Sequence, residues 1–159
     1  MRHLLLLVIA LVPFLSFSQQ VKSIVDTYDH KSRIYVDQVK LKSSVFISFR
    51  TIGENIYLYI EGSGEAVGMI NQNDVAIFVT EKDSIIAKST GTQDYHDRSR
   101  DFRHEYTITE DGLRKLSASP IKTVIQYTTS GISQTNIPEA RQRLLMNASL
   151  NLLKEYEKR

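Results

Sequence analysis

The sequence contains no cysteine and no tryptophan, and only three of its 159 residues are proline. The lack of cysteine excludes a disulfide scaffold, a thiolate metal site, a cysteine nucleophile and a lipid anchor on an N-terminal cysteine. Charge of one sign is lacking too, since 20 Lys and Arg residues oppose 18 Asp and Glu residues. The formal net charge of +2 therefore gives no electrostatic argument for a nucleic-acid partner. The composition is that of an ordinary globular domain with one hydrophobic core.

The first 18 residues are typical of a secretory signal peptide. A basic start at residues 1–3 precedes the apolar stretch 4–15, and small side chains stand one and three places before the bond that follows Ser18. This stretch is too short to span a membrane, for which about 20 apolar residues are needed, and later apolar segments are shorter still. We therefore expect cleavage after Ser18 and export of a single domain, residues 19–159, to the periplasm or medium of a bacterium, with no membrane span.

Residues 21–129 are rich in Val, Ile, Tyr, Phe and Thr and are broken at short intervals by turn residues. This pattern favours strands, and the short links between them exclude parallel crossovers. The clearest predicted hairpin joins 45–50 to 56–60 across a turn at 52–55. Further strands are predicted at 21–28, 33–41, 66–70, 75–80, 84–88, 102–108 and, as the last strand, 121–128.

A short helical turn is predicted after the strand at 102–108, where Thr109 can cap a segment that runs through Leu116. A long helix is predicted at 138–158, because Pro138 suits a first helical position. Its apolar residues cover an arc of about 240° at 100° per residue. They are Leu144, Leu145, Met146, Ala148, Leu150, Leu152, Leu153 and Tyr156.

One flat sheet cannot cover so broad an apolar arc, so the helix needs either a curved sheet that grips it or a second contact surface. We therefore predict an α+β fold in which an antiparallel β-meander of about seven to nine strands forms a curved sheet or open barrel, with the C-terminal helix packed on it. The alternative for part of this arc is a surface for a homodimer or an unknown protein partner.

Glycines at 62, 64 and 68, followed by Asp83, superficially match a dinucleotide-binding loop. The third glycine comes one place late, and the residues that follow read as strand and turn where a phosphate-binding helix is required. We interpret these glycines as a loop or bulge.

Ser119 and Lys122 match a Ser-x-x-Lys motif, but the motif opens a strand here and a helix in penicillin-recognising enzymes. Asn147 begins a formal glycosylation sequon, which we assign to the helix surface.

The densest polar segment is 94–106, and its first possible role is metal binding. A metal would use His96, Asp97 or Asp101, and His104, because imidazole and carboxylate groups suit zinc and related ions. In a strand at 102–108, however, His104 shares a face with Phe102, so it also fits a half-buried position on an aromatic face. We favour the second interpretation and assign no metal ligand.

Nucleic-acid binding by the same segment would use Arg98, Arg100 and Arg103 with the aromatic rings of Tyr95 and Phe102. Four carboxylates outnumber these three arginines, which leaves a local charge of −1, so we expect a solvated loop and no nucleic-acid partner. The carboxylates belong to Asp94, Asp97, Asp101 and Glu105.

No catalytic residue and no cofactor-binding residue is assigned. After processing, histidine is limited to His30, His96 and His104, and no spacing selects a nucleophile and base pair. We expect an exported, non-catalytic module that binds another macromolecule. The alternative is a carrier that holds a small apolar ligand between a curved sheet and the last helix, an arrangement similar in outline to helix-grip and lipocalin-like proteins.

Overall fold

The computed structural model describes residues 20–42, 44–63, 68–96 and 101–159, and for 95 and 96 it describes the backbone alone. The described chain forms one sheet of nine strands and two helices, α2 (Glu110–Ala118) and α3 (Glu139–Tyr156). The strands are β1 (Val21–Val25), β2 (Ser32–Lys42), β3 (Val45–Ile52), β4 (Asn55–Gly62), β5 (Val75–Thr80), β6 (Ser84–His96), β7 (Asp101–Ile108), β8 (Ile121–Thr128) and β9 (Gly131–Asn136).

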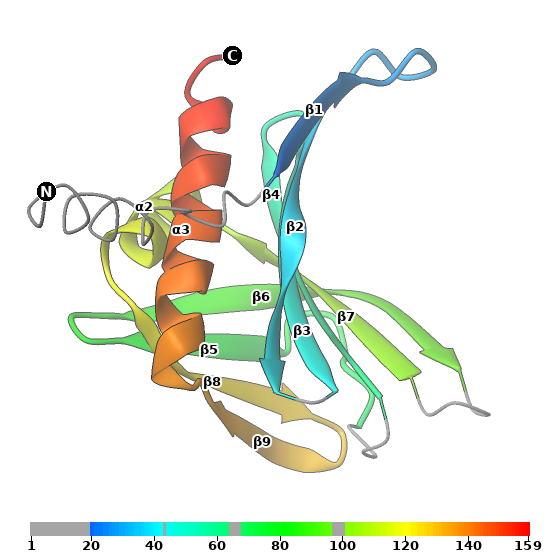
Figure 1. Cartoon of the computed structure of the whole chain (residues 1–159). Coiled ribbons are helices and arrows are strands. Elements are labelled where there is room, and N and C mark those ends of the chain that lie inside the picture. Colours follow the sequence, from blue (N-terminus) through cyan, green and yellow to red (C-terminus); the bar gives the residue numbers. More distant parts are fainter. Residues whose placement is uncertain (1–19, 43, 64–67, 97–100) are drawn as a thin grey trace, which may run out of the picture.

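All strand pairs are antiparallel, and the spatial order is β1-β2-β3-β4-β7-β6-β5-β8-β9 (Figure 1). The predicted α+β fold is confirmed, with an antiparallel sheet that the described strands leave unclosed. The meander is interrupted twice, because β4 pairs with β7 and β5 pairs with β8, while the hairpins β5–β6 and β6–β7 run back across the sheet between them. In the described part of the chain, no helix combines the length and apolarity that crossing a bilayer demands.

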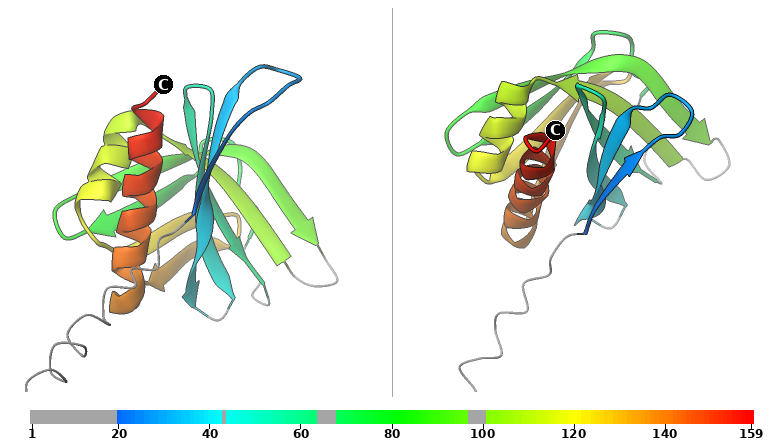
Figure 2. Two further views of the ribbon diagram at one scale, coloured as in Figure 1. Left: turned by 45° about the horizontal axis from the view of Figure 1, so that its top comes forward. Right: turned by 90° about the horizontal axis from the view of Figure 1, so that it is seen from above.

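The sheet curves around α3, with α2 beside it on the same concave side (Figure 2). The α3 helix packs on α2, on β1 to β3 at one end of the sheet and on β8 near the other. Four of its predicted apolar positions are buried, namely Leu145, Ala148, Leu152 and Leu153, and Leu144 and Tyr156 pack against the core. Curvature thus covers most of the broad apolar arc, and Met146 and Leu150 stay half-buried.

Four strand predictions need correction. The strand predicted at 21–28 ends at Val25, because 26–28 belong to the turn into β2. Residues 68–70 of the strand predicted at 66–70 are not in a strand, and 66–67 lie outside the described residues. β6 continues eight residues beyond its predicted end at 88, because its polar second half pairs with β7 on the far side of a bulge between Ser89 and Gln93. The last strand is β9, a mainly exposed edge strand whose sequence lacks the apolar alternation that identifies a strand.

Other local predictions are confirmed. The β3–β4 hairpin turns at Gly53, whose φ of 55° is easy only for glycine, and Thr109 caps α2 by accepting from the N–H of Gly112. Gly62, in contrast, is not in the loop or bulge expected for it, because it is the last residue of β4, where it pairs with Phe102. A Cβ at that position would lie 2.5 Å from the Phe102 ring, so the glycine lets this ring cross the strand end.

Candidate functional site

Tyr59 is buried on the wrong side of the sheet for the main core. Leu58 and Ile60, its neighbours in β4, point to the concave side and are fully buried there. Because successive side chains of a strand point to opposite faces, Tyr59 lies on the outer face, away from both helices. Tyr59 is nevertheless only 3% exposed. Something other than a packed helix must cover this ring.

Two guanidinium groups cover the Tyr59 ring. Arg50 comes from β3 and Arg103 from β7, the two neighbours of β4, and their Cζ atoms lie 4.4 Å and 4.3 Å from the ring centroid. The register explains this placement, since Arg50 pairs with Tyr57 and Arg103 with Glu61, each two residues from Tyr59. The Nε atoms of both arginines are buried without a hydrogen-bond partner in the described part of the chain.

The Glu105 carboxylate links the members of this stack. Its Oε2 accepts from the Tyr59 hydroxyl at 2.5 Å and from Arg50 Nη2 at 3.2 Å, and its Oε1 accepts from Thr90 Oγ1 at 2.9 Å. The cluster of Arg50, Tyr59, Thr90, Arg103 and Glu105 is called the arginine–tyrosine clamp below. Burial raises the pKa of the Tyr59 hydroxyl above its ordinary value, and the bond to Glu105 raises it further.

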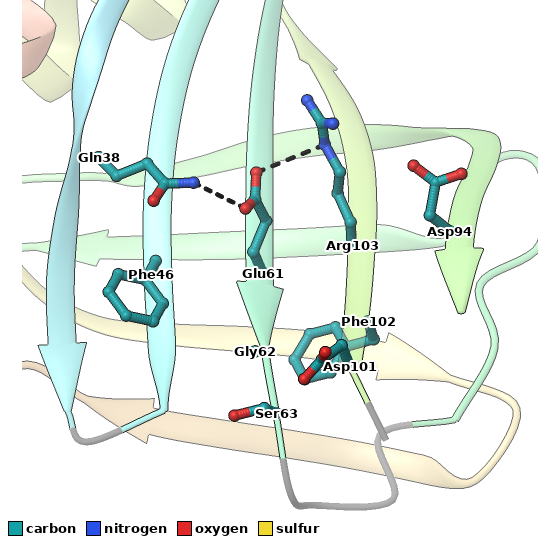
Figure 3. Close-up of a pocket in the computed structure, with 9 residues that line it drawn as sticks. All are labelled: Gln38, Phe46, Glu61, Gly62, Ser63, Asp94, Asp101, Phe102 and Arg103. Carbon is teal, nitrogen blue, oxygen red and sulfur yellow. Dashed lines mark hydrogen bonds and ion pairs between the residues drawn. The ribbon is translucent and has the colours of Figure 1, made fainter. Parts of the chain in front are cut away.

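A groove of about 390 Å³ lies beside the clamp on the same face (Figure 3). Its central carboxylate, Glu61, accepts from Gln38 Nε2 at 2.7 Å and forms a 3.4 Å ion pair with Arg103 Nε. Arg103 therefore belongs to both the clamp and the groove. The groove is lined by Gln38, Phe46, Glu61, Gly62, Ser63, Asp94, Asp101, Phe102 and Arg103.

The groove lining combines the ring of Phe46 with an excess of negative charge. Three carboxylates, those of Glu61, Asp94 and Asp101, oppose the single guanidinium of Arg103. In the described chain Asp94 and Asp101 have no recorded hydrogen-bond or ion-pair partner, whereas Glu61 is already paired. The ring of Phe46 faces the Lys40 ammonium, 5.8 Å from its centroid. Such a lining suits a ligand group that is positively charged and partly apolar.

The candidate metal ligands are not brought together as far as the structure describes them. Asp101 and His104 are three places apart in β7 and so point to opposite faces, with Asp101 in the groove and His104 in the core. The backbone of His96 pairs with Asp101, but the His96 side chain and Asp97 lie outside the described residues. The described residues contain no group of three or more potential ligands arranged for a metal ion.

The candidate nucleic-acid residues are likewise divided. Arg103 stacks on Tyr59, and Phe102 points to the concave side with 5% exposure. Arg98, Arg100 and the Tyr95 side chain lie outside the described residues.

The remaining motif residues are also separated by the fold. Ser119 ends α2 and is buried, whereas Lys122 is exposed in β8 and pairs with Glu81. Asp83 lies in the β5–β6 turn, and Gly68 precedes β5 rather than a helix, while Gly64 lies outside the described residues. Asn147 is exposed on α3, as expected.

His104 lies deeper than the half-buried position predicted for it. It is 2% exposed and its ring centroid is 4.9 Å from that of Phe102. Its Nδ1 lies 3.3 Å from Gln126 Nε2, which also donates to the Tyr106 hydroxyl at 3.1 Å. Burial lowers the pKa of His104 to about 4 and raises that of Tyr106 to about 12. At neutral pH this is an uncharged polar contact inside the core.

Sequence reasoning missed the clamp because its members come from four strands. The usable signal was the alternation of each strand, in which Arg50, Tyr59 and Glu105 lie on the face opposite to the core. Their meeting depends on the β4–β7 pairing, which sequence patterning does not reveal.

Comparison with models of protein families, with curated protein sequences and with solved structures gives no significant match for this chain.

Tyr59→Phe should lower the free energy of unfolding by about 1–2 kcal/mol, because Glu105 loses one of the donors that compensate its burial. Tyr57→Phe is the matched control, since Tyr57 lies on the same face of β4 and its hydroxyl has no recorded partner among the described residues. Urea unfolding of the three proteins measures the difference. Equal losses in both variants would contradict the role assigned to the Tyr59 hydroxyl.

The burial of His104 should make stability depend on pH. Its folded pKa of about 4 lies below the ordinary value of 6.5, so the unfolded chain takes up the proton first as pH falls. The stability contributed by the neutral ring is complete above about pH 6.5 and is lost toward pH 4, by about 2 kcal/mol between pH 7 and pH 5.

His104→Gln removes this titration while keeping a polar group of similar size. Urea unfolding at pH 7 and pH 5 should show a smaller loss in this variant than in the native protein. Parallel losses in the two proteins would show that His104 does not carry the dependence.

Proposed function

We propose that this protein is an exported, non-catalytic module that binds a protein partner in the outer-face groove. The partner would present a lysine or arginine side chain to the groove. The observation that carries the proposal is the groove itself, in which the carboxylates of Asp94 and Asp101, which have no recorded partner among the described residues, stand on the same sheet face as the Phe46 ring. Cations bind well where carboxylates and ring faces act together.

The clamp supports this proposal because it fixes one wall of the groove. Arg103 is held by the Tyr59 ring on one side and by Glu61 on the other. The Arg103 charge is thereby balanced by Glu61. The carboxylates of Asp94 and Asp101 then remain to attract a positively charged ligand. A wall that is ordered before binding lowers the entropic cost of association.

Binding is favoured over catalysis by the chemistry of the described titratable groups. Burial moves the pKa of His104 down and those of Tyr59 and Tyr106 up, away from neutral pH in each case. General acid–base groups work best with a pKa near the operating pH. These three groups therefore suit structural roles.

The carrier alternative has less support. It requires room between the sheet and the helices, and side chains of both helices occupy the concave side. Leu113 and Leu116 of α2 and Leu145 and Leu152 of α3 are fully buried there.

A binding test can use two labelled peptides, four Lys-Ser repeats and four Glu-Ser repeats, followed by fluorescence anisotropy. The native protein should bind the lysine peptide more tightly than the glutamate peptide. The double variant Asp94→Asn/Asp101→Asn should weaken lysine-peptide binding at least about tenfold, because it removes both unpaired carboxylates.

The control is Glu110→Gln/Asp111→Asn on α2, which removes the same amount of charge from an exposed site. It should change lysine-peptide binding less than about twofold. Equal weakening by the two double variants would show general electrostatic attraction and would overturn the groove proposal, as would a lack of binding.

Export is proposed from the leader sequence alone. Leu7→Arg interrupts the apolar stretch, so it should keep the protein in the cytoplasm, whereas the native chain should leave it and start at Gln19. Cell fractionation and N-terminal sequencing measure both results. Exported protein that retains Met1 would contradict cleavage after Ser18.

A further inference from the structure

The strand β1 forms one edge of the sheet, and its turn into β2 projects away from the helices (Figure 1). Four of its five residues are exposed, and Ile24 and Val25 are 55% and 63% exposed. Edge strands of monomers are usually protected by proline, by bulges or by several charges. β1 has no proline, its pairing with β2 is regular, and its one charged residue is Lys22.

The backbone of β1 has hydrogen-bonding groups directed outward. Asp26 N donates to Lys31 O at 3.0 Å, and Asp37 N donates to Gln20 O at 3.3 Å. Hydrogen-bonded positions alternate along an antiparallel strand, so the even-numbered residues of β1 face β2. The N–H and C=O groups of Ser23 and Val25 therefore point to the free edge.

The side chains of this edge complement those of a second copy. If two β1 strands pair antiparallel about a two-fold axis at Ile24, Ser23 of each copy lies opposite Val25 of the other, which allows four backbone hydrogen bonds. On the outer face, Ile24 then meets Ile24, and each Lys22 lies opposite Asp26 of the other copy. Asp26 is on that face, because its carboxylate forms a 3.0 Å ion pair with Arg33.

We propose that two copies of this chain associate through their β1 edges in this register, forming a two-fold symmetric dimer with one continuous sheet. The pairing satisfies free backbone groups, covers Ile24 and Val25 and matches opposite charges twice. The contact is a single strand, so the dimer is reversible and depends on concentration. The surface is separate from the groove, and the proposal does not depend on the proposed function.

The first test is sedimentation of the purified domain, residues 19–159, over a range of concentrations. The native domain should show a reversible monomer–dimer equilibrium. Ser23→Pro should weaken it at least about tenfold, because proline removes an outward N–H that makes no bond to the described residues of its own chain. A monomer at all concentrations would overturn the proposal, as would a dimer that Ser23→Pro leaves unchanged, since that dimer would use another surface such as Met146 and Leu150.

The second test checks the register by exchanging charges. Lys22→Glu and Asp26→Lys should each weaken self-association, because like charges then face each other. An equimolar mixture should associate again, since each interface pair in the mixed dimer has opposite charges. If the mixture associates no better than the single variants, the register is wrong.

Crosslinking gives an independent measurement, which stays informative if a charge variant alters the β1–β2 turn. In this cysteine-free chain, Ile24→Cys would face its own copy at a non-hydrogen-bonded pair, where Cα atoms lie about 4.5 Å apart and a disulfide can form. Ile132→Cys on the opposite edge strand, 67% exposed, is the control. Ile24→Cys should form disulfide dimers at least about tenfold faster. Equal rates would overturn the proposed pairing.

Discussion

The fold depends on the contact between α3 and the concave side of the sheet. The apolar arc of α3 is wider than a flat sheet can cover, so strands from both ends of the sheet contact it, β1 to β3 from one end and β8 from the other. Bulges in β2, β6 and β8 accompany this curvature. No described helix packs on the outer face, and the centre of β4 is covered there by the arginine–tyrosine clamp.

The two faces of the sheet therefore exclude water by different means. Aliphatic and aromatic residues fill the concave side, with Phe49, Leu58 and Phe78 fully buried. On the outer side, stacked guanidinium groups and one shared carboxylate cover a single aromatic ring. The same arginine that covers Tyr59 also borders the groove, so the packing of this face and its proposed binding surface are one arrangement.

The sequence predicted the fold class, the β3–β4 hairpin, the Thr109 cap and the curved sheet around the last helix, because each depends on local patterning. It missed β9 and the second half of β6, whose polar residues are held in strands by their neighbours. The candidate site was not predicted, since Arg50, Tyr59 and Glu105 meet only after β4 and β7 have paired. His104 was placed on the right face, but its full burial depends on tertiary packing.

The interrupted strand order has a consequence for folding kinetics. The consecutive hairpins within β1 to β4 and within β5 to β7 can form from local contacts. The sheet becomes continuous only when β4 pairs with β7, for example Ile56 with Ile108, and β5 pairs with β8, for example Ala76 with Gln126. Each pairing closes a loop of about 50 residues, and such non-local contacts slow the search for the native state. The rate-limiting step of folding is therefore expected at the β4–β7 and β5–β8 seams, after the local hairpins have formed.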